Sequence, residues 1–494
     1  MKLRALVAAL SVVLAGCPSV PRDAPAGGGT PATPVTSAAC ENGTLGMEAL
    51  PVSRALRARF SLPSNVPGAV IGEVLPGGPA AAAGLRPGDI VLRVGETDVR
   101  DDCEFDAVAF QRSCEPVDVV VARGAERRTV SLTPADGLSF LERACREGAP
   151  GACNRRALVL WTLARGEAEK TTAIDAFASA CRVGDAEACA NGGLLVQERP
   201  GREGEAVPML ERACALGSAA GCAHLAFLHA TGTLVPRNDA TATPLYVRSC
   251  ELGDVRGCYN EALMFENGRG VPKDLTRAVA AYREACEEGR NPTACTNLGF
   301  LVERGIGVAQ SAERAVELYG RGCAGAPCQA PNLAGCVNLA RSYRDGKGVA
   351  KDVARAARMF QDLCEKPVDP GDLQSAEVHQ SRACALLGGL YLNGSGVPKD
   401  LAKGRSYSEI ACSKGDAFGC FNGGVIHSGG LGVPKDLALA AYFYDKGCLA
   451  GDGESCFELA QAHEKGNGVA VSKARAKELL TKACASGFAQ ACRK

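Results

Sequence analysis

The sequence predicts a multidomain protein in which a small α+β module is followed by an all-α, disulfide-stapled α/α solenoid. The first observation is that cysteines recur in close pairs from Cys145 to the end of the 494-residue chain. The leading cysteines are about 36 residues apart, and seven of the ten have a partner eight positions later. A fixed period of this length is typical of repeat architectures. The second observation is a β-rich segment that precedes the pairs, within residues 42–134.

The chain contains 25 cysteines, which indicates an oxidising compartment. Metal binding is disfavoured because the sequence lacks C-x-x-C knuckles and has only five histidines. Cys40, Cys103, Cys114 and Cys328 are left without an assigned partner. The expected disulfides join Cys145 to Cys153, Cys181 to Cys189, Cys214 to Cys222, Cys250 to Cys258, Cys286 to Cys295, Cys323 to Cys336, Cys364 to Cys384, Cys412 to Cys420, Cys448 to Cys456, and Cys484 to Cys492.

The N-terminus has the pattern of an export signal. A short basic start is followed by an apolar run that is too short to span a bilayer comfortably. Residues 14–17, Leu-Ala-Gly-Cys, resemble a bacterial lipobox, so residues 1–16 are expected to be a lipoprotein signal peptide and Cys17 the lipidated residue. Residues 17–41, rich in Pro and Gly, are expected to form a tether. An ordinary secretion signal with a chance cysteine is the alternative.

Residues 42–134 are expected to fold as the α+β module. The runs 69–74, 89–94 and 117–121 are rich in β-branched residues, and residues 129–132 alternate as a final strand should. Residues 79–84 suit a short helix and residues 102–112 a longer one. Strands interrupted by short helices in this order predict a small α+β module.

The module resembles a bacterial PDZ domain of the type attached to periplasmic serine proteases. The resemblance rests on Val74-Leu-Pro-Gly-Gly-Pro-Ala80 and Gly84-Leu-Arg-Pro-Gly-Asp89. In that family a loop of backbone N–H groups holds a peptide carboxylate, and the peptide adds a strand beside the loop. The resemblance implies that the peptide-binding residues are Gly43, Thr44, Leu45, Gly46, Met47, Phe105, Val108 and Ala109. The alternative is that the module packs on the repeats and binds no peptide.

The repeat unit is clearest between Cys258 and Gly289. Residues 258–267 are expected to form a first helix, residues 268–274 a turn, and residues 275–288 a second helix that Gly289 ends. Asp274 is a suitable N-cap because its side chain can accept an unpaired backbone N–H. Asp254 is expected to cap the preceding first helix in the same way. Apolar residues of the second helix fall on one stripe, which a neighbouring repeat must cover.

This pattern resembles Sel-1-like repeats, which are relatives of the tetratricopeptide repeat, in their cysteine-rich bacterial form. The resemblance covers residues 138–494 and implies nine complete helix pairs. Each cysteine pair is expected to join the end of one second helix to the first turn of the next helix. Insertions interrupt the period after Cys323 and after Cys364, and they are expected to form loops.

The function expected from this organisation is an envelope-anchored scaffold or adaptor for protein–protein interaction, not an enzyme. The sequence lacks the G-x-S-x-G, H-E-x-x-H, Walker A, S-x-x-K and K-T-G motifs. Lysine plus arginine and aspartate plus glutamate balance at 55 each, which disfavours nucleic acid.

The expected partners are envelope proteins or peptide C-termini, and the membrane through the N-terminal lipid, with no cofactor and no metal. The expected location is the bacterial outer membrane, facing the periplasm or the surface. Two alternatives remain open: a penicillin-binding or weak β-lactamase-type hydrolase, which the cysteine-rich repeat family suggests, and a secreted effector.

Overall fold

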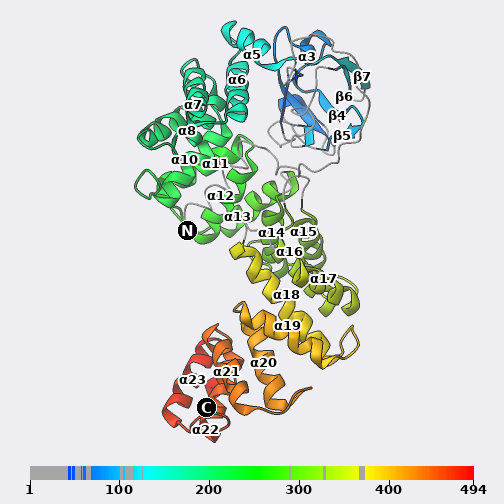
Figure 1. The fold of residues 1–494 in the computed structure, drawn as a ribbon, viewed down its shortest axis with the longest axis vertical. Helices are drawn as coiled ribbons and strands as arrows, with labels where there is room; N and C mark the ends of the chain where they lie inside the picture. The colour runs from blue at the N-terminus through cyan, green and yellow to red at the C-terminus, as the bar shows by residue number, and fades with distance from the viewer. Residues whose placement is uncertain are drawn as a thin grey trace. The chain divides into compact units, whose positions relative to one another are not determined.

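The structure is a computed structural model of the chain. It describes residues 43–45, 47–50, 57, 59–62, 68–100, 104–105, 115–124, 126–288, 291–325, 330–366 and 373–493. Cys17, Gly46, Val108, Ala109 and the unassigned cysteines therefore lie outside the described residues, as does most of the helix expected over residues 102–112. The predicted fold class is confirmed, because a small sheet is followed by paired helices to the C-terminus (Figure 1).

The N-terminal module (residues 43–136) is built on an antiparallel sheet with the strand order β2-β3-β4-β6-β7. A short strand β5 (Thr97–Asp98) pairs with β4, and β1 (Gly43–Thr44) pairs separately with β8 (Ala135–Asp136). β8 lies beyond the expected final strand and leads directly into the first helix of the repeat region. The remaining strands are β2 (Met47–Leu50), β3 (Ala69–Val74), β4 (Ile90–Val94), β6 (Val117–Arg123) and β7 (Glu126–Leu132).

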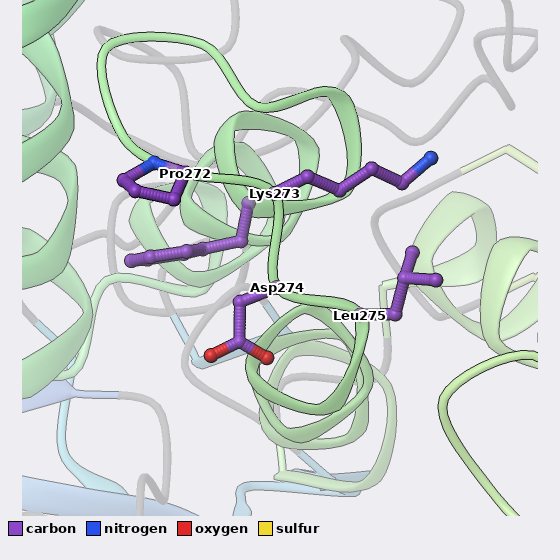
Figure 2. A pocket seen from close by; sticks show the side chains of 5 residues that line it. Pro272, Lys273, Asp274 and Leu275 are labelled. Carbon is purple, nitrogen blue, oxygen red and sulfur yellow. The ribbon is translucent and has the colours of Figure 1, made fainter.

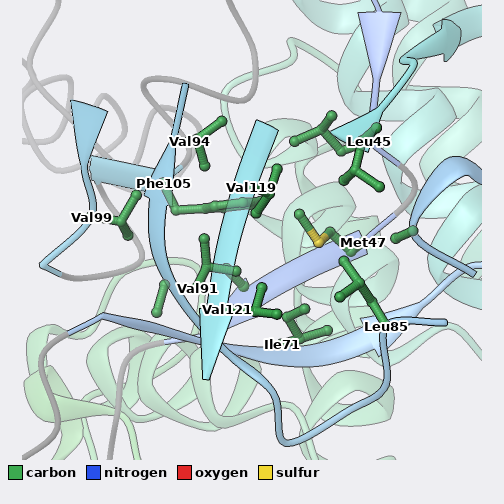
Figure 3. Close-up of a cluster of buried hydrophobic side chains, with 14 of the residues drawn as sticks. Leu45, Met47, Ile71, Leu85, Val91, Val94, Val99, Phe105, Val119 and Val121 are labelled. Atoms are coloured by element: carbon green, nitrogen blue, oxygen red, sulfur yellow. The ribbon is translucent and has the colours of Figure 1, made fainter. Parts of the chain in front are cut away.

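The larger buried cluster of the module lies on one face of this sheet, and Val70, Ile90 and Ala122 form a second, smaller cluster. Alternating residues of the strands point inward, as the period of two requires. A short helix, α3 (Pro79–Ala82), adds Ala80 to the cluster. Figure 3 shows the buried side chains, which come from β2, β3, β4, β6 and the segments between them.

The repeat region begins with α5 (Gly137–Arg146), and within the described residues nine helix pairs follow it. The first helices of the pairs are α6 (Pro150–Leu163), α8 (Ala186–Val196), α10 (Ala219–Thr231), α12 (Val255–Asn267), α14 (Pro292–Arg304), α16 (Leu333–Asp345), α18 (Leu373–Asn393), α20 (Ala417–Gly429) and α22 (Gly453–Lys465). The second helices are α7 (Glu167–Arg182), α9 (Ala206–Ala215), α11 (Asp239–Glu251), α13 (Leu275–Arg283), α15 (Ala312–Ala324), α17 (Val353–Glu365), α19 (Leu401–Ser413), α21 (Leu437–Leu449) and α23 (Lys473–Ala485).

Side-chain caps fix where the helices begin. The Asp274 carboxylate accepts a hydrogen bond from the Arg277 N–H, and Asp254 accepts from the N–H groups of Arg256 and Gly257. Both predicted caps are therefore confirmed. The Asp254 cap places the start of α12 at Val255, three residues before the expected Cys258.

The turn between α12 and α13 contains two glycines that have different structural roles. Gly268 ends α12 in the left-handed conformation, with φ of 66°, and its N–H bonds to the Met264 carbonyl. Gly270, with φ of 68°, lies against the backbone at the start of α11 in the preceding pair. A Cβ atom at Gly270 would overlap the Asp239 carbonyl group, whereas one at Gly268 would meet the Lys273 Cβ at 3.3 Å. The second glycine is therefore a contact between pairs.

Within the part of the chain that the structure describes, ten disulfides connect consecutive elements, and they join the same ten pairs that were expected. Their Cα–Cα distances run from 4.4 Å to 4.9 Å, which lies in the ordinary range for disulfides. The first bridge joins α5 to α6, and the next eight each span the loop from a second helix to the next first helix. The last one joins α23 to a 3-10 turn at Ala491–Arg493. The bridges are Cys145 with Cys153, Cys181 with Cys189, Cys214 with Cys222, Cys250 with Cys258, Cys286 with Cys295, Cys323 with Cys336, Cys364 with Cys384, Cys412 with Cys420, Cys448 with Cys456, and Cys484 with Cys492.

The second cysteine of a bridge also belongs to the core, which the spacing of the cysteines did not predict. In every bridge before the last, this residue is at most 6% exposed. The residues concerned are Cys153, Cys189, Cys222, Cys258, Cys295, Cys336, Cys384, Cys420 and Cys456. Eight of them are in the first turn of a first helix, as expected, whereas Cys384 lies in the middle of α18, because that helix begins eleven residues earlier, at Leu373. These cysteines therefore serve both as disulfide partners and as core residues.

The structure corrects two expectations about the repeats. The helix expected over residues 275–288 is α-helical only to Arg283 and continues as a π-helix over Glu284–Glu288. This turn coincides with the pair whose separation is nine instead of eight, Cys286 and Cys295, and a π turn accommodates one additional residue. The insertion after Cys364 is not only a loop, because α18 begins at Leu373 and its 21 residues include part of that insertion.

The chain forms two compact units. One comprises the described residues within Met1–Cys295 and Gly325–Ala330, and the other those within Thr296–Ala324 and Pro331–Lys494. The first unit holds the N-terminal module together with the early helix pairs. A buried cluster joins them: Leu75, directly after β3, packs with Phe140 and Leu141 of α5 and Ala152 of α6.

Candidate peptide-binding site

The expected carboxylate-binding loop lies at the start of the module, and its flanks are anchored on both sides. Gly43 and Thr44 pair with Asp136 and Ala135 as β1 with β8. The Leu45 carbonyl accepts a hydrogen bond of 3.0 Å from the Ala80 N–H, in α3. The loop therefore contacts both the short helix of the PDZ-like motif and the strand that leads to the repeats.

The side chains near this loop belong to the core. Leu45 and Met47 are 3% and 4% exposed, and Phe105 is 2% exposed in the same cluster (Figure 3). Their side chains therefore hold the loop in place, and the groups left to meet a ligand are those of the backbone. The sequence did not distinguish these core roles from groove-lining roles, because a groove side chain and a core side chain are equally apolar.

The strand after the loop, β2, is the outermost strand of the sheet. It pairs antiparallel with β3, with Met47 opposite Val74 and Leu50 opposite Val70, and the described residues place no strand on its other side. An outermost strand exposes backbone N–H and C=O groups that another extended chain can pair with. At Met47 the carbonyl already accepts a 2.6 Å hydrogen bond from the Arg155 guanidinium of α6.

A buried carboxylate stabilises the turn that carries the PDZ-like motif. Asp89 is 2% exposed and accepts hydrogen bonds from the Arg86 N–H and from the Arg123 guanidinium, whose Nε lies 2.6 Å away. A buried charge needs such pairing. Arg123 and Arg128 also donate to the Gly84 carbonyl. The aspartate of the motif thus has a structural role in holding this turn.

The early helix pairs hold polar groups between neighbouring first helices. Asn191 of α8 donates a hydrogen bond to Asn154 of α6, and the Asp185 carboxylate accepts from the Asn154 N–H. His224, in α10, lies near Arg256 of α12 and near Asp254, which caps α12. Burial, and secondarily the Arg256 charge, lower the pKa of His224 to about 4.

His224 should make the stability of the first unit depend on pH. Because the folded pKa lies below the unfolded value of about 6.5, the unfolded chain binds the proton more readily between these values. This contribution is present above pH 6.5 and is lost as the pH falls toward 4. We expect a loss of at most about 3 kcal/mol, since the ring keeps part of its surface in solvent.

Urea unfolding at pH 7 and at pH 5 tests this expectation. His224→Gln should show a smaller drop in unfolding midpoint between the two pH values than the wild type. His463→Gln, in the other unit, is the matched control and should behave as the wild type does. An equal drop in wild type and His224→Gln would show that His224 is not the cause.

The turn of the clearest repeat forms an open hollow (Figure 2). Phe265, Pro272, Lys273, Asp274 and Leu275 line it. The Arg277 guanidinium covers the Phe265 ring at 4.1 Å from its centroid, and Asp274 is used as a helix cap. Phe265 and Asp274 therefore have structural partners. Across the described residues, His, Cys, Asp and Glu side chains do not gather into any group that could hold a metal ion. None of the described helices is long and apolar enough to cross a membrane.

The described architecture defines an α/α repeat protein that carries a PDZ-type module. The PDZ domain family model matches residues 51–122. The Sel1 repeat model matches seven times and covers half of the chain, at residues 219–254, 255–289, 292–326, 333–366, 381–416, 417–452 and 453–488. The chain belongs to the Sel1 repeat family. The matches begin at α10, so the first two helix pairs, α6–α7 and α8–α9, lie outside them.

Individual relatives resemble separate parts of the chain. A mitochondrial serine protease HTRA2 from Drosophila sechellia is 33% identical over 78 residues, which are 15% of this chain and 18% of that protein. A putative serine protease HhoB from Synechocystis is 36% identical over 92 residues, or 17% of this chain and 21% of that protein. This chain thus spans about a fifth of the length of these curated relatives.

Among solved structures, a Sel1 repeat protein from Oxalobacter formigenes is 22% identical, with a TM-score of 0.48, and covers 68% of this chain and 91% of its own. Cysteine rich protein B from Helicobacter pylori is 28% identical, with a TM-score of 0.23, and covers 25% of this chain and 91% of its own.

Proposed function

We propose that this protein is a non-catalytic scaffold for protein–protein interaction at the bacterial cell envelope. In this proposal the PDZ module binds the C-terminal segment of one protein, and the Sel1 solenoid binds a second protein. The combination of a PDZ domain with Sel1 repeats supports an interaction role. The lipid anchor at Cys17 and the outer-membrane location are part of the proposal and rest on the sequence alone.

The observation that carries the proposal is the outermost position of β2, directly after the candidate carboxylate-binding loop. A peptide that adds as a strand gains main-chain hydrogen bonds along β2, and its terminal carboxylate can meet backbone N–H groups of the loop. Because Leu45 and Met47 are buried in the core, the residues on both sides of Gly46 are held in place before a ligand arrives. A preorganised site loses less entropy on binding.

The test is binding of the full chain to a pool of decapeptides with randomised last four residues. One pool ends in a free carboxylate, and the matched pool has the same sequences with amidated C-termini. We expect retention of the free-acid pool only, because the amide removes the charge that the loop is proposed to bind. Equal retention of both pools, or retention of neither, would contradict peptide capture by the terminus.

The envelope anchor needs a separate experiment. Labelling cells with a fatty-acid analogue should mark the wild-type protein and leave Cys17→Ser unmarked and released from membranes. A membrane-bound, unlabelled protein would contradict the anchor without affecting the scaffold proposal.

A further inference from the structure

The first helix pair of the repeat region reaches the candidate peptide-binding edge. Arg155, in α6, donates a hydrogen bond of 2.6 Å from Nη1 to the Met47 carbonyl, although 108 positions separate the two residues. Met47 is the first residue of β2 and directly follows the candidate loop. The guanidinium therefore lies at the place where an added peptide strand would begin to pair with β2.

Two further contacts hold α6 against this part of the module. Leu75 packs with Ala152 and with residues of α5 in a buried cluster. Glu73 of β3 lies at the first turn of α6, so close that a Cβ at Gly151 would overlap its carboxylate. An acidic group at a helix N-terminus is favourable, and α6 has no acidic residue of its own in its first turn.

The backbone adds a further connection, because β8 ends at Asp136 and α5 begins at the next residue. The Arg155 contact is thus one part of an interface that also fixes the position of α6. It is not a lone surface side chain.

At the Met47 carbonyl oxygen, a hydrogen bond from the Arg155 side chain is stronger than one from the backbone of an incoming peptide. A guanidinium is a charged donor, and a charge-assisted hydrogen bond is roughly twice as strong as one from a neutral amide. A peptide strand can offer only neutral N–H groups to the carbonyls of β2. A peptide that binds therefore either displaces Arg155 from the Met47 carbonyl or pairs only with the part of β2 beyond Met47.

We infer that Arg155 is an autoinhibitory latch through which the first helix pair closes the start of the PDZ-type groove. This inference rests on the proposed peptide binding at β2. The physical consequence is that the apparent affinity of the groove depends on the repeat region, and that a partner able to displace α6 from the module opens the groove.

The test compares four full-length proteins: wild type, Arg155→Ala, Arg155→Lys and Arg146→Ala. Arg146, an exposed residue in the last turn of α5, is the matched control for loss of one positive charge near the interface. We expect Arg155→Ala to bind the free-acid decapeptide pool about tenfold more tightly, since hydrogen bonds to charged groups contribute on the order of one factor of ten or more. Arg155→Lys, which retains charge but loses the planar fork, should fall between wild type and Arg155→Ala.

Amide hydrogen exchange provides a second readout that requires no peptide. The segment over residues 47–50 should exchange faster in Arg155→Ala than in wild type or Arg146→Ala. Equal or weaker peptide binding by Arg155→Ala, or unchanged exchange over residues 47–50, would overturn the latch. Failure of every variant to bind either peptide pool would instead overturn the proposed function, and the two failures are therefore distinguishable.

Discussion

Replacing Gly270 by alanine should lower the free energy of unfolding of the first unit by about 3 kcal/mol, because backbone strain and overpacking add together. The first part arises because φ is 68°, a left-handed conformation that side chains disfavour. The second arises because the new Cβ would overlap the Asp239 carbonyl group at the start of α11.

The neighbouring contacts leave little room for adjustment at Gly270. The Arg269 guanidinium donates to the Asp239 carboxylate and to the Ala230 carbonyl, and Thr243 donates to the Arg269 carbonyl. The hydrogen bond from Arg269 to the Asp239 carboxylate, together with one from Arg237, lowers the pKa of Asp239 to about 2. The turn is therefore fastened to the preceding helix pair, and moving it would break this connection.

Gly268→Ala is the matched control, because Gly268 has nearly the same φ, 66°, but meets only the Lys273 Cβ at 3.3 Å. It should cost about 1 kcal/mol, the ordinary penalty for the left-handed conformation. Denaturant unfolding measures both values. Equal losses for the two variants would show that backbone strain alone matters and that the close approach between helix pairs does not.

Removing an internal disulfide should have an effect of similar size. The double variant Cys250→Ala with Cys258→Ala opens the bridge between α11 and α12, and we expect a loss of about 2–3 kcal/mol from the increased entropy of the unfolded chain. The bridge spans eight positions, and Cys258 is buried. Substituting both cysteines avoids leaving a single reactive thiol in the core. Thermal unfolding under non-reducing conditions measures the change.

The terminal bridge between Cys484 and Cys492 is the matched control, since it also spans eight positions. Cys492 is exposed, and the short 3-10 turn that contains it ends the described chain. A terminal element of a solenoid contacts a neighbour on one side only, so its loss should affect the main transition less. A small effect from the internal pair and a large one from the terminal pair would contradict this account of coupling along the solenoid.

Local sequence signals predicted most of the solenoid. Asp254 and Asp274 are placed as helix caps, and the paired cysteines lie close to the turns that they bridge. Most of these features depend on residues fewer than a dozen positions apart, although two of the cysteine pairs are 13 and 20 positions apart. The resemblance to PDZ domains likewise rested on a contiguous motif around Gly84–Asp89, whose buried carboxylate explains the residue types.

The features that the sequence did not predict depend on contacts between distant segments. The pairing of β8 with β1, the hydrogen bond from Arg155 to Met47 and the packing of Leu75 on α5 each join residues far apart in the chain. The π-helix at Glu284–Glu288 was missed for a different reason, because the change from eight to nine positions between cysteines does not say where the additional residue is absorbed.

The central claim is that ten disulfides staple consecutive helices into one repeat scaffold. Its most direct test starts from purified protein that has not been reduced. The protein is unfolded in denaturant and alkylated, and intact-mass measurement and peptide mapping then show which cysteines are labelled. We expect the twenty cysteines of the ten bridges to remain unlabelled and to become labelled only after reduction. Labelling of most of these twenty without reduction would contradict the claim, and with it the proposed location outside the cytoplasm.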